Sequence, residues 1–107
     1  MRELLKRRRD PKNLDDLRRK VQQAREIVDM RRDSTGWKLI EFQLGVQIEA
    51  AVKTLSDRAK SAEEVDDARH LLVAVELLRS ILSRIESDGQ NAQEELNLLT
   101  KEDDQHG

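Results

Sequence analysis

One group of side chains has the types and spacing of a metal site. Glu63, Asp67 and His70 follow one another at steps of four and three, which places them on one face of a helix. Carboxylates and an imidazole are ligands for hard or borderline metals. Di-metal bundles need a second Glu-x-x-His spacing on a facing helix, and the other histidine of this chain, His106, lies in the C-terminal tail that we expect to fray. Acidic residues are also common in the first turn of a helix, where the positive end of the helix dipole stabilises them. This explains the group without a metal, so we expect no metal and no cofactor.

Adjacent carboxylates such as Glu63-Glu64 and Asp66-Asp67 have the types needed for an acid and base pair. That chemistry needs a pocket of low dielectric constant to separate their pKa values, and these residues fall on solvated helix positions. The chain has no Cys and no Gly-rich phosphate loop. We therefore expect no catalytic residues, no small-molecule substrate and no enzyme activity.

A basic N-terminal arm over residues 1–12 is the strongest candidate for contact with another class of molecule. Lysine and arginine neutralise phosphates, so this arm predicts sequence-nonspecific, salt-dependent binding of nucleic acid. No aromatic residues alternate with the cations, and a solvated arm or one that docks on an acidic protein surface is the competing interpretation. The cations of the arm are Arg2, Lys6, Arg7, Arg8, Arg9 and Lys12.

The composition favours surface over core. Charged residues make up 39% and apolar residues 36%, and Ala, Glu, Lys, Leu and Arg account for about half of the 107 residues, as in long helices and coiled coils. Charge is uneven, with net +5 over residues 1–33 and net −7 over residues 34–107. No apolar run approaches the ~20 residues that span a bilayer, and no signal-peptide core follows Met1. We expect no membrane contact and a cytoplasmic or virion location.

Helical periodicity predicts an amphipathic basic helix over residues 13–33, with Asn13 as its N-cap. Residues 33–36 break the pattern and offer capping side chains before Trp37. The helix is marginal alone, so it needs another surface, in its own chain or in a neighbour. Its apolar stripe is Leu14, Leu17, Val21, Ala24 and Val28.

A second helix is predicted from Trp37 to Ala59, with its main apolar seam along Trp37, Ile40, Leu44, Ile48, Ala51, Leu55 and Ala59. A second apolar group, Leu39, Phe42, Val46 and Ala50, falls on the opposite side. Residues 40–48 also alternate like a strand, but no other stretch offers a partner, so helix is favoured. Gly45 then predicts a close helix contact.

The third helix has a capping box at Ser61-Ala-Glu-Glu64 and runs to Glu86, where Asp88-Gly89 predicts a C-terminal stop. Its length and the short connection before it predict an antiparallel helical hairpin over residues 36–88. Residues 89–107 are predicted to form a short amphipathic segment and an acidic tail that frays. The predicted fold is all-α, a coiled-coil-like two-helix hairpin with an additional N-terminal helix.

The predicted hairpin has more apolar surface than one chain covers. A two-helix hairpin needs one stripe on each helix, yet both helices are apolar on further sides, and such exposure is unusual in a monomer. We therefore expect a homo-oligomer or docking on a larger assembly. The predicted interface residues are Trp37, Phe42, Val46, Leu72, Leu77 and Ile81.

A resemblance covers residues 37–86. An aromatic-led helix (37–42, then 47–49 and Leu55), an acidic turn (61–69) and a Leu-rich helix (77–82) resemble the small helical-hairpin proteins encoded in head-assembly gene clusters of tailed bacteriophages. The resemblance implies a virion or assembly component that acts through protein contacts, and it transfers no functional residue.

Overall fold

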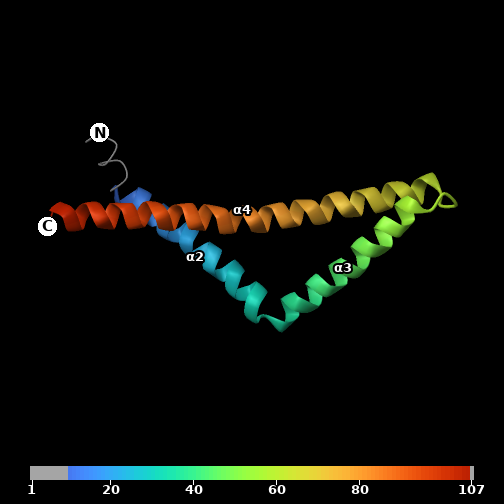
Figure 1. Cartoon of the computed structure of the whole chain (residues 1–107), viewed down its shortest axis with the longest axis horizontal. Helices are drawn as coiled ribbons and strands as arrows, with labels where there is room; N and C mark the ends of the chain where they lie inside the picture. The colour runs from blue at the N-terminus through green and yellow to red at the C-terminus, as the bar shows by residue number, and fades with distance from the viewer. Residues whose placement is uncertain (1–9, 107) are drawn as a thin grey trace. The chain divides into compact units, whose positions relative to one another are not determined.

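The computed structural model describes residues 10–106, which form three helices: α2 (Pro11–Asp33), α3 (Thr35–Ser56) and α4 (Ala62–His106) (Figure 1). No strand occurs within this range, so the predicted all-α class is confirmed and residues 40–48 are helical. None of the helices in the described part of the chain is long and apolar enough to cross a membrane.

The start of α2 differs from the prediction. The helix begins at Pro11, and Asp10 rather than Asn13 caps it: the Asp10 carboxylate accepts a hydrogen bond from the backbone N–H of Lys12 at 3.2 Å. The backbone C=O of Asp10 accepts from the N–H of Leu14 at 3.0 Å. Proline suits the first helical position because it lacks an N–H that would be unpaired there and its φ is already helical.

The interruption between α2 and α3 lies where the capping residues predicted it. Ser34 has an extended backbone, and its hydroxyl accepts a hydrogen bond from the N–H of Trp37 at 3.1 Å. This bond satisfies one of the unpaired N–H groups at the start of the helix. At the other end α3 stops at Ser56, three residues before the predicted end at Ala59.

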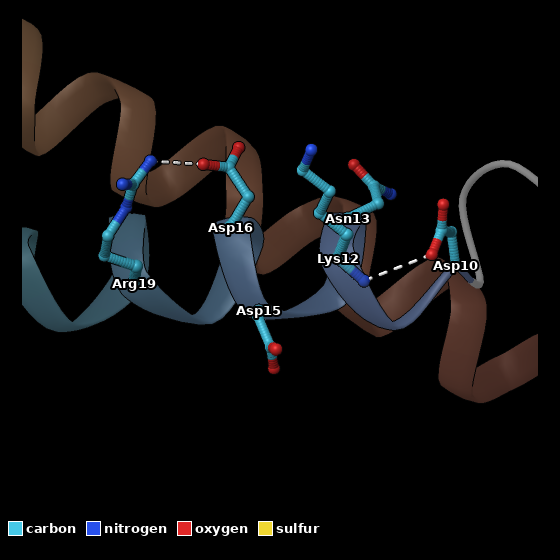
Figure 2. A pocket seen from close by; sticks show the side chains of 6 residues that line it. All are labelled: Asp10, Lys12, Asn13, Asp15, Asp16 and Arg19. Atoms are coloured by element: carbon cyan, nitrogen blue, oxygen red, sulfur yellow. Dashed lines mark hydrogen bonds and ion pairs between the residues drawn. The ribbon is translucent and has the colours of Figure 1, made fainter.

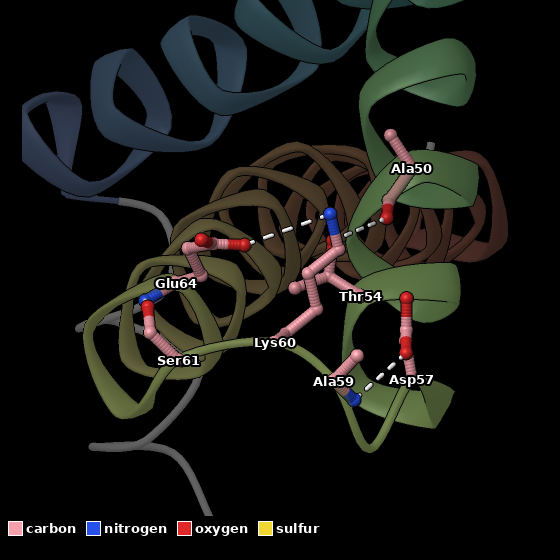
Figure 3. Close-up of polar contacts among 7 residues, drawn as sticks. All are labelled: Ala50, Thr54, Asp57, Ala59, Lys60, Ser61 and Glu64. Carbon is pink, nitrogen blue, oxygen red and sulfur yellow. Dashed lines mark hydrogen bonds and ion pairs between the residues drawn. The ribbon is translucent and has the colours of Figure 1, made fainter.

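The connection from α3 to α4 is closed by local side-chain bonds (Figure 3). The carboxylate of Asp57 accepts a hydrogen bond from the N–H of Ala59 at 2.9 Å, which competes with another turn of helix. The hydroxyl of Ser61 accepts from the N–H of Glu64 at 3.2 Å, as the predicted N-cap requires. The amine of Lys60 lies 3.6 Å from the carboxylate of Glu64. These bonds end one helix and start the next within five residues.

The predicted stop at Asp88-Gly89 and the separate short amphipathic segment within residues 89–107 are wrong. α4 continues without interruption to His106, and no described glycine has a positive φ, the conformation that such a stop needs. The acidic residues that were predicted to fray are also helical up to His106.

The described chain divides into two compact units. The first consists of the residues up to Asp29 and those from Ser83 onward, and the second of Met30–Leu82. In the first unit, α2 packs on the C-terminal part of α4 (Figure 1). Its core holds the buried residues Leu17, Ala92 and Leu99, with Leu14, Val21 and Leu96 packed against them. The predicted stripe of α2 is thus covered by its own chain, although Val28 remains exposed.

Gly89 allows a close approach of α2 to α4. A Cβ atom on Gly89 would lie 2.1 Å from the Cβ of Ala24 and 3.0 Å from the backbone oxygen of Lys20. No side chain fits there unless the two helices separate, since neither of these neighbours is the end of a flexible side chain. The glycine is therefore required by the packing of the two helices. Glycine in a helix interior is less favourable than alanine by about 1 kcal/mol, and the packing offsets this cost.

In the second unit, α3 and the N-terminal part of α4 pack in opposite directions. One pocket near their connection is lined by residues 47–54 of α3 and 64–71 of α4, and a second by residues 37–44 of α3 and 78–82 of α4. Residue numbers thus rise along α3 as they fall along α4. The buried residues of this unit are Ala51, Ala68 and Val75.

The predicted close contact at Gly45 is wrong. A Cβ atom built on this glycine meets nothing within 4 Å. Gly45 and Gly89 are both in helix interiors, but only Gly89 has a packing reason for lacking a side chain. The pair therefore offers matched substitutions with opposite expected signs.

We predict that Gly89→Ala lowers the free energy of unfolding by about 1 to 2 kcal/mol, because overpacking at Ala24 exceeds the gain in helix propensity. Gly45→Ala should raise it by about 0.5 to 1 kcal/mol. Urea unfolding followed by circular dichroism measures both changes.

The double variant Gly89→Ala with Ala24→Gly is the control, since it returns the space that the new methyl group occupies. It should recover part of the stability lost in Gly89→Ala. If Gly89→Ala is as stabilising as Gly45→Ala, the close contact of α2 with α4 does not exist in solution.

Candidate protein-interaction surface

The outer side of α3 carries exposed apolar residues, which we call the α3 outer face: Leu39, Phe42 and Val46. Their exposed fractions are 62%, 66% and 44%. Steps of three and four residues place them on one side of the helix. Ala51, which is buried in the second unit, lies on the other side, so packing inside the unit leaves this face uncovered.

α4 carries a corresponding surface in the same unit, the α4 outer face: Val73, Leu77 and Ile81. Their exposed fractions are 68%, 61% and 44%. They follow at steps of four, while Val75, on the opposite side, is buried. Two helices of one unit thus each present an apolar stripe away from their mutual contact.

Four of the six predicted interface residues lie on these faces: Phe42, Val46, Leu77 and Ile81. The other two, Trp37 and Leu72, are half-buried. Leu72 lies about 100° around α4 from Val73, its neighbour in sequence, which turns its side chain toward the packed side. The prediction missed Val73, although its spacing of four residues from Leu77 places both on the same side of the helix.

Trp37 is held within the second unit. Its indole Nε1–H donates a hydrogen bond to the carboxylate of Glu41 at 2.5 Å, and Nε of Arg31 lies 3.5 Å from the same carboxylate oxygen. The indole lines a pocket of about 190 Å³ together with Leu44, Leu78 and Leu82, among other residues. These contacts favour a packing role for Trp37 over the predicted role as a partner anchor.

Most of the predicted nucleic-acid surface lies outside the described residues: Arg2, Lys6, Arg7, Arg8 and Arg9. Lys12 is described and exposed, at the start of α2. It lines an open pocket in which the carboxylates of Asp10, Asp15 and Asp16 outnumber the cations of Lys12 and Arg19 (Figure 2). This pocket is a poor phosphate site because its carboxylates repel anions.

Several cations of α2, namely Arg18, Arg19, Lys20 and Arg32, pair with acids of the same helix. The guanidinium of Arg19 donates to the Asp16 carboxylate, as Figure 2 shows, and the amine of Lys20 lies 3.2 Å from the other oxygen of Asp16. Hydrogen bonding and attraction from Lys20, together with Arg19, hold the pKa of Asp16 below its ordinary value. Arg32 likewise lowers the pKa of Asp33 by a hydrogen bond. Much of the positive charge of α2 is therefore balanced locally.

The described residues offer no group of three His, Cys, Asp or Glu side chains that could hold a metal ion. No protein-family model, no curated protein and no solved structure matches the chain. Function therefore has to be argued from the two outer faces and the charges around them.

The lowered pKa of Asp16 predicts a pH dependence for α2. A carboxyl group whose folded pKa lies below its unfolded value, near 3.8, contributes stability above that value and loses it as pH falls through the folded pKa. Asp16→Asn should therefore lower the urea midpoint at pH 7 and leave it nearly unchanged at pH 2.

The matched control is Asp15→Asn in the same turn, where the Asp15 carboxylate lies 3.8 Å from the guanidinium of Arg18 and both side chains are exposed. Its effect at pH 7 should be smaller than that of Asp16→Asn. Equal effects of Asp16→Asn at the two pH values would contradict this account of the ion pairs.

Proposed function

We propose that this protein is a non-enzymatic structural or interaction protein that associates with copies of itself through helix–helix contacts. The observation that carries the proposal is the pair of exposed apolar stripes, the α3 outer face and the α4 outer face, on one unit. Contiguous apolar stripes on a small soluble domain are typical of protein-interaction sites.

The energetics favour association. Full burial of a Val, Leu, Ile or Phe side chain contributes about 1.5 to 3 kcal/mol relative to exposure, and six such residues lie on the two faces. The second unit itself buries only Ala51, Ala68 and Val75. A partner that covered the two outer faces would therefore add to the apolar burial of this unit.

The specific assembly we propose is a bacteriophage virion or the machinery that builds a phage head, which gives a virion or cytoplasmic location. The support for this form is the resemblance of residues 37–86 to small helical-hairpin proteins of phage head-assembly gene clusters. The resemblance implies a component that acts through protein contacts.

The second candidate function is nucleic-acid binding by a small regulatory or packaging protein. The uneven charge supports it, since residues 1–33 carry net +5. Arg19 and Lys20 pair with Asp16, so this candidate depends mainly on the cations of the basic arm, residues 1–12.

Self-association is tested on the full chain by size-exclusion chromatography with light scattering. The wild-type protein at micromolar concentration should elute with a mass above that of one chain, and Phe42→Asp should shift it toward the monomer by placing a charge on the α3 outer face. Circular dichroism should show unchanged helix content because Phe42 is exposed.

Val52→Asp is the control for that shift, because Val52 is 48% exposed on α3 but lies off the outer face. It should keep the wild-type mass. A clean wild-type monomer at these concentrations would remove the basis of the proposed function.

The second candidate, nucleic-acid binding, predicts that affinity depends on the basic arm and on salt concentration. Replacing residues 6–9 by Ala should weaken DNA or RNA binding and reduce its salt dependence, whereas the wild-type affinity should fall steeply between roughly 50 and 200 mM salt. Fluorescence anisotropy with a labelled duplex measures both. If these replacements leave the affinity for nucleic acid unchanged, the second candidate fails. The oligomer mass should stay the same whether or not nucleic-acid binding is lost.

A further inference from the structure

A pocket lies between α3 and the N-terminal part of α4, where the two helices separate as they run away from their connection (Figure 1). Near the connection the small residues Ala51 and Ala68 are buried. Farther along, the inner sides of the helices continue as larger residues, Leu44 on α3 and Leu78 on α4, which stay half-buried. Because the helices have diverged there, these side chains line a pocket of about 190 Å³, which we call the Trp37 pocket.

The walls of the Trp37 pocket are mostly apolar. They are formed by the indole ring of Trp37 and the side chains of Leu44, Leu78 and Leu82. An empty space of this kind forfeits dispersion contacts on the atoms that line it. Its size suits one aromatic ring with a short substituent, since an engineered apolar cavity of about 150 Å³ in another protein binds benzene. Aromatic rings also pack favourably against an indole.

The remaining lining residues are charged: Arg31, Glu41 and Arg79. The carboxylate of Glu41 accepts a hydrogen bond from Nε1 of Trp37 at 2.5 Å and lies 3.5 Å from Nε of Arg31, so it balances that guanidinium. Arg79 is exposed and forms no ion pair with any residue that the structure describes. The pocket therefore has one excess positive charge, on a guanidinium group whose geometry matches a carboxylate.

We infer that the Trp37 pocket binds a small aromatic carboxylic acid as its monoanion. The ring lies against Trp37 and the leucines, and the carboxylate pairs with Arg79. An apolar pocket with a few polar groups that fix orientation is the usual form of a small-molecule site. A second carboxylate on the ligand would meet Glu41, and an amine in place of the carboxylate would be repelled by Arg79.

This site goes beyond the proposed self-association. All of its lining residues lie within the second unit, Met30–Leu82, and none of them belongs to the α3 outer face or the α4 outer face. Ligand binding and oligomer mass are therefore separate measurements, and the failure of one leaves the other standing.

Phenylacetate is the probe for the test on the full chain. Trp37 is the one tryptophan in the sequence, so its emission reports on the pocket during a titration. We expect a saturable shift to shorter wavelength, because a bound ring displaces water from the indole. The Kd should be on the order of 0.1 to 1 mM for so small a ligand. Saturating phenylacetate should also raise the urea midpoint, since it binds the folded state.

Arg79→Gln tests the assigned carboxylate contact. It should weaken phenylacetate binding by roughly 2- to 5-fold, as expected for an exposed ion pair, and leave binding of the neutral analogue phenylacetamide unchanged. Arg84→Gln is the matched control, because Arg84 is also exposed on α4 but does not line the pocket. It should keep the wild-type affinity for both compounds. Both variants should keep the wild-type helix content by circular dichroism.

Leu44→Phe tests the location of the ring. The larger side chain fills part of the pocket and should abolish the saturable change in emission. If this variant loses helix content, the comparison of phenylacetate with phenylacetamide in Arg79→Gln decides the question alone.

Three results would overturn the inference. The absence of a saturable change up to about 10 mM phenylacetate excludes the site, given the affinity expected for a ligand of this size. Equal affinities for phenylacetate and phenylacetamide show that the pocket selects the ring without the carboxylate. An equal loss of affinity in Arg84→Gln and Arg79→Gln indicates attraction by the overall charge of the chain instead of a contact in the pocket.

Discussion

The architecture depends on the close contact between α2 and α4 at Gly89. Because no side chain stands at this position, the backbone of α2 at Lys20 and the methyl group of Ala24 lie directly against α4. That approach brings Leu17, Ala92 and Leu99 into a common core. α4 runs through Gly89 without interruption and contributes to both units of the chain.

The second unit, in contrast, leaves several of its large apolar side chains exposed. Its buried residues are two alanines and one valine, while larger apolar side chains on both of its helices face outward. Small residues lie buried at the α3–α4 contact, and larger ones such as Leu44, Leu71 and Leu78 are half-buried beside them. The outward residues, Phe42 and Leu77 among them, contribute little to packing within the unit because more than half of each side chain is exposed.

Periodicity along the sequence predicted much of this arrangement. The all-α class, the cap at Ser61 and the break before Trp37 follow from local side-chain chemistry, and four of the six predicted interface residues are exposed on the outer faces. The role of Gly89 was not predictable in this way, because it depends on Ala24, which is distant in sequence. The contrast between Leu72 and Val73 also needed the structure, since it depends on which side of α4 turns toward α3.

Trp37, whose indole N–H donates a hydrogen bond to Glu41, is an intrinsic fluorescent probe of this structure. Trp37 is the one tryptophan in the chain, so all indole emission comes from the start of α3. The ring lies beside Leu78 and Leu82 and off both outer faces. Its emission wavelength therefore reports on the packing of α3 against α4.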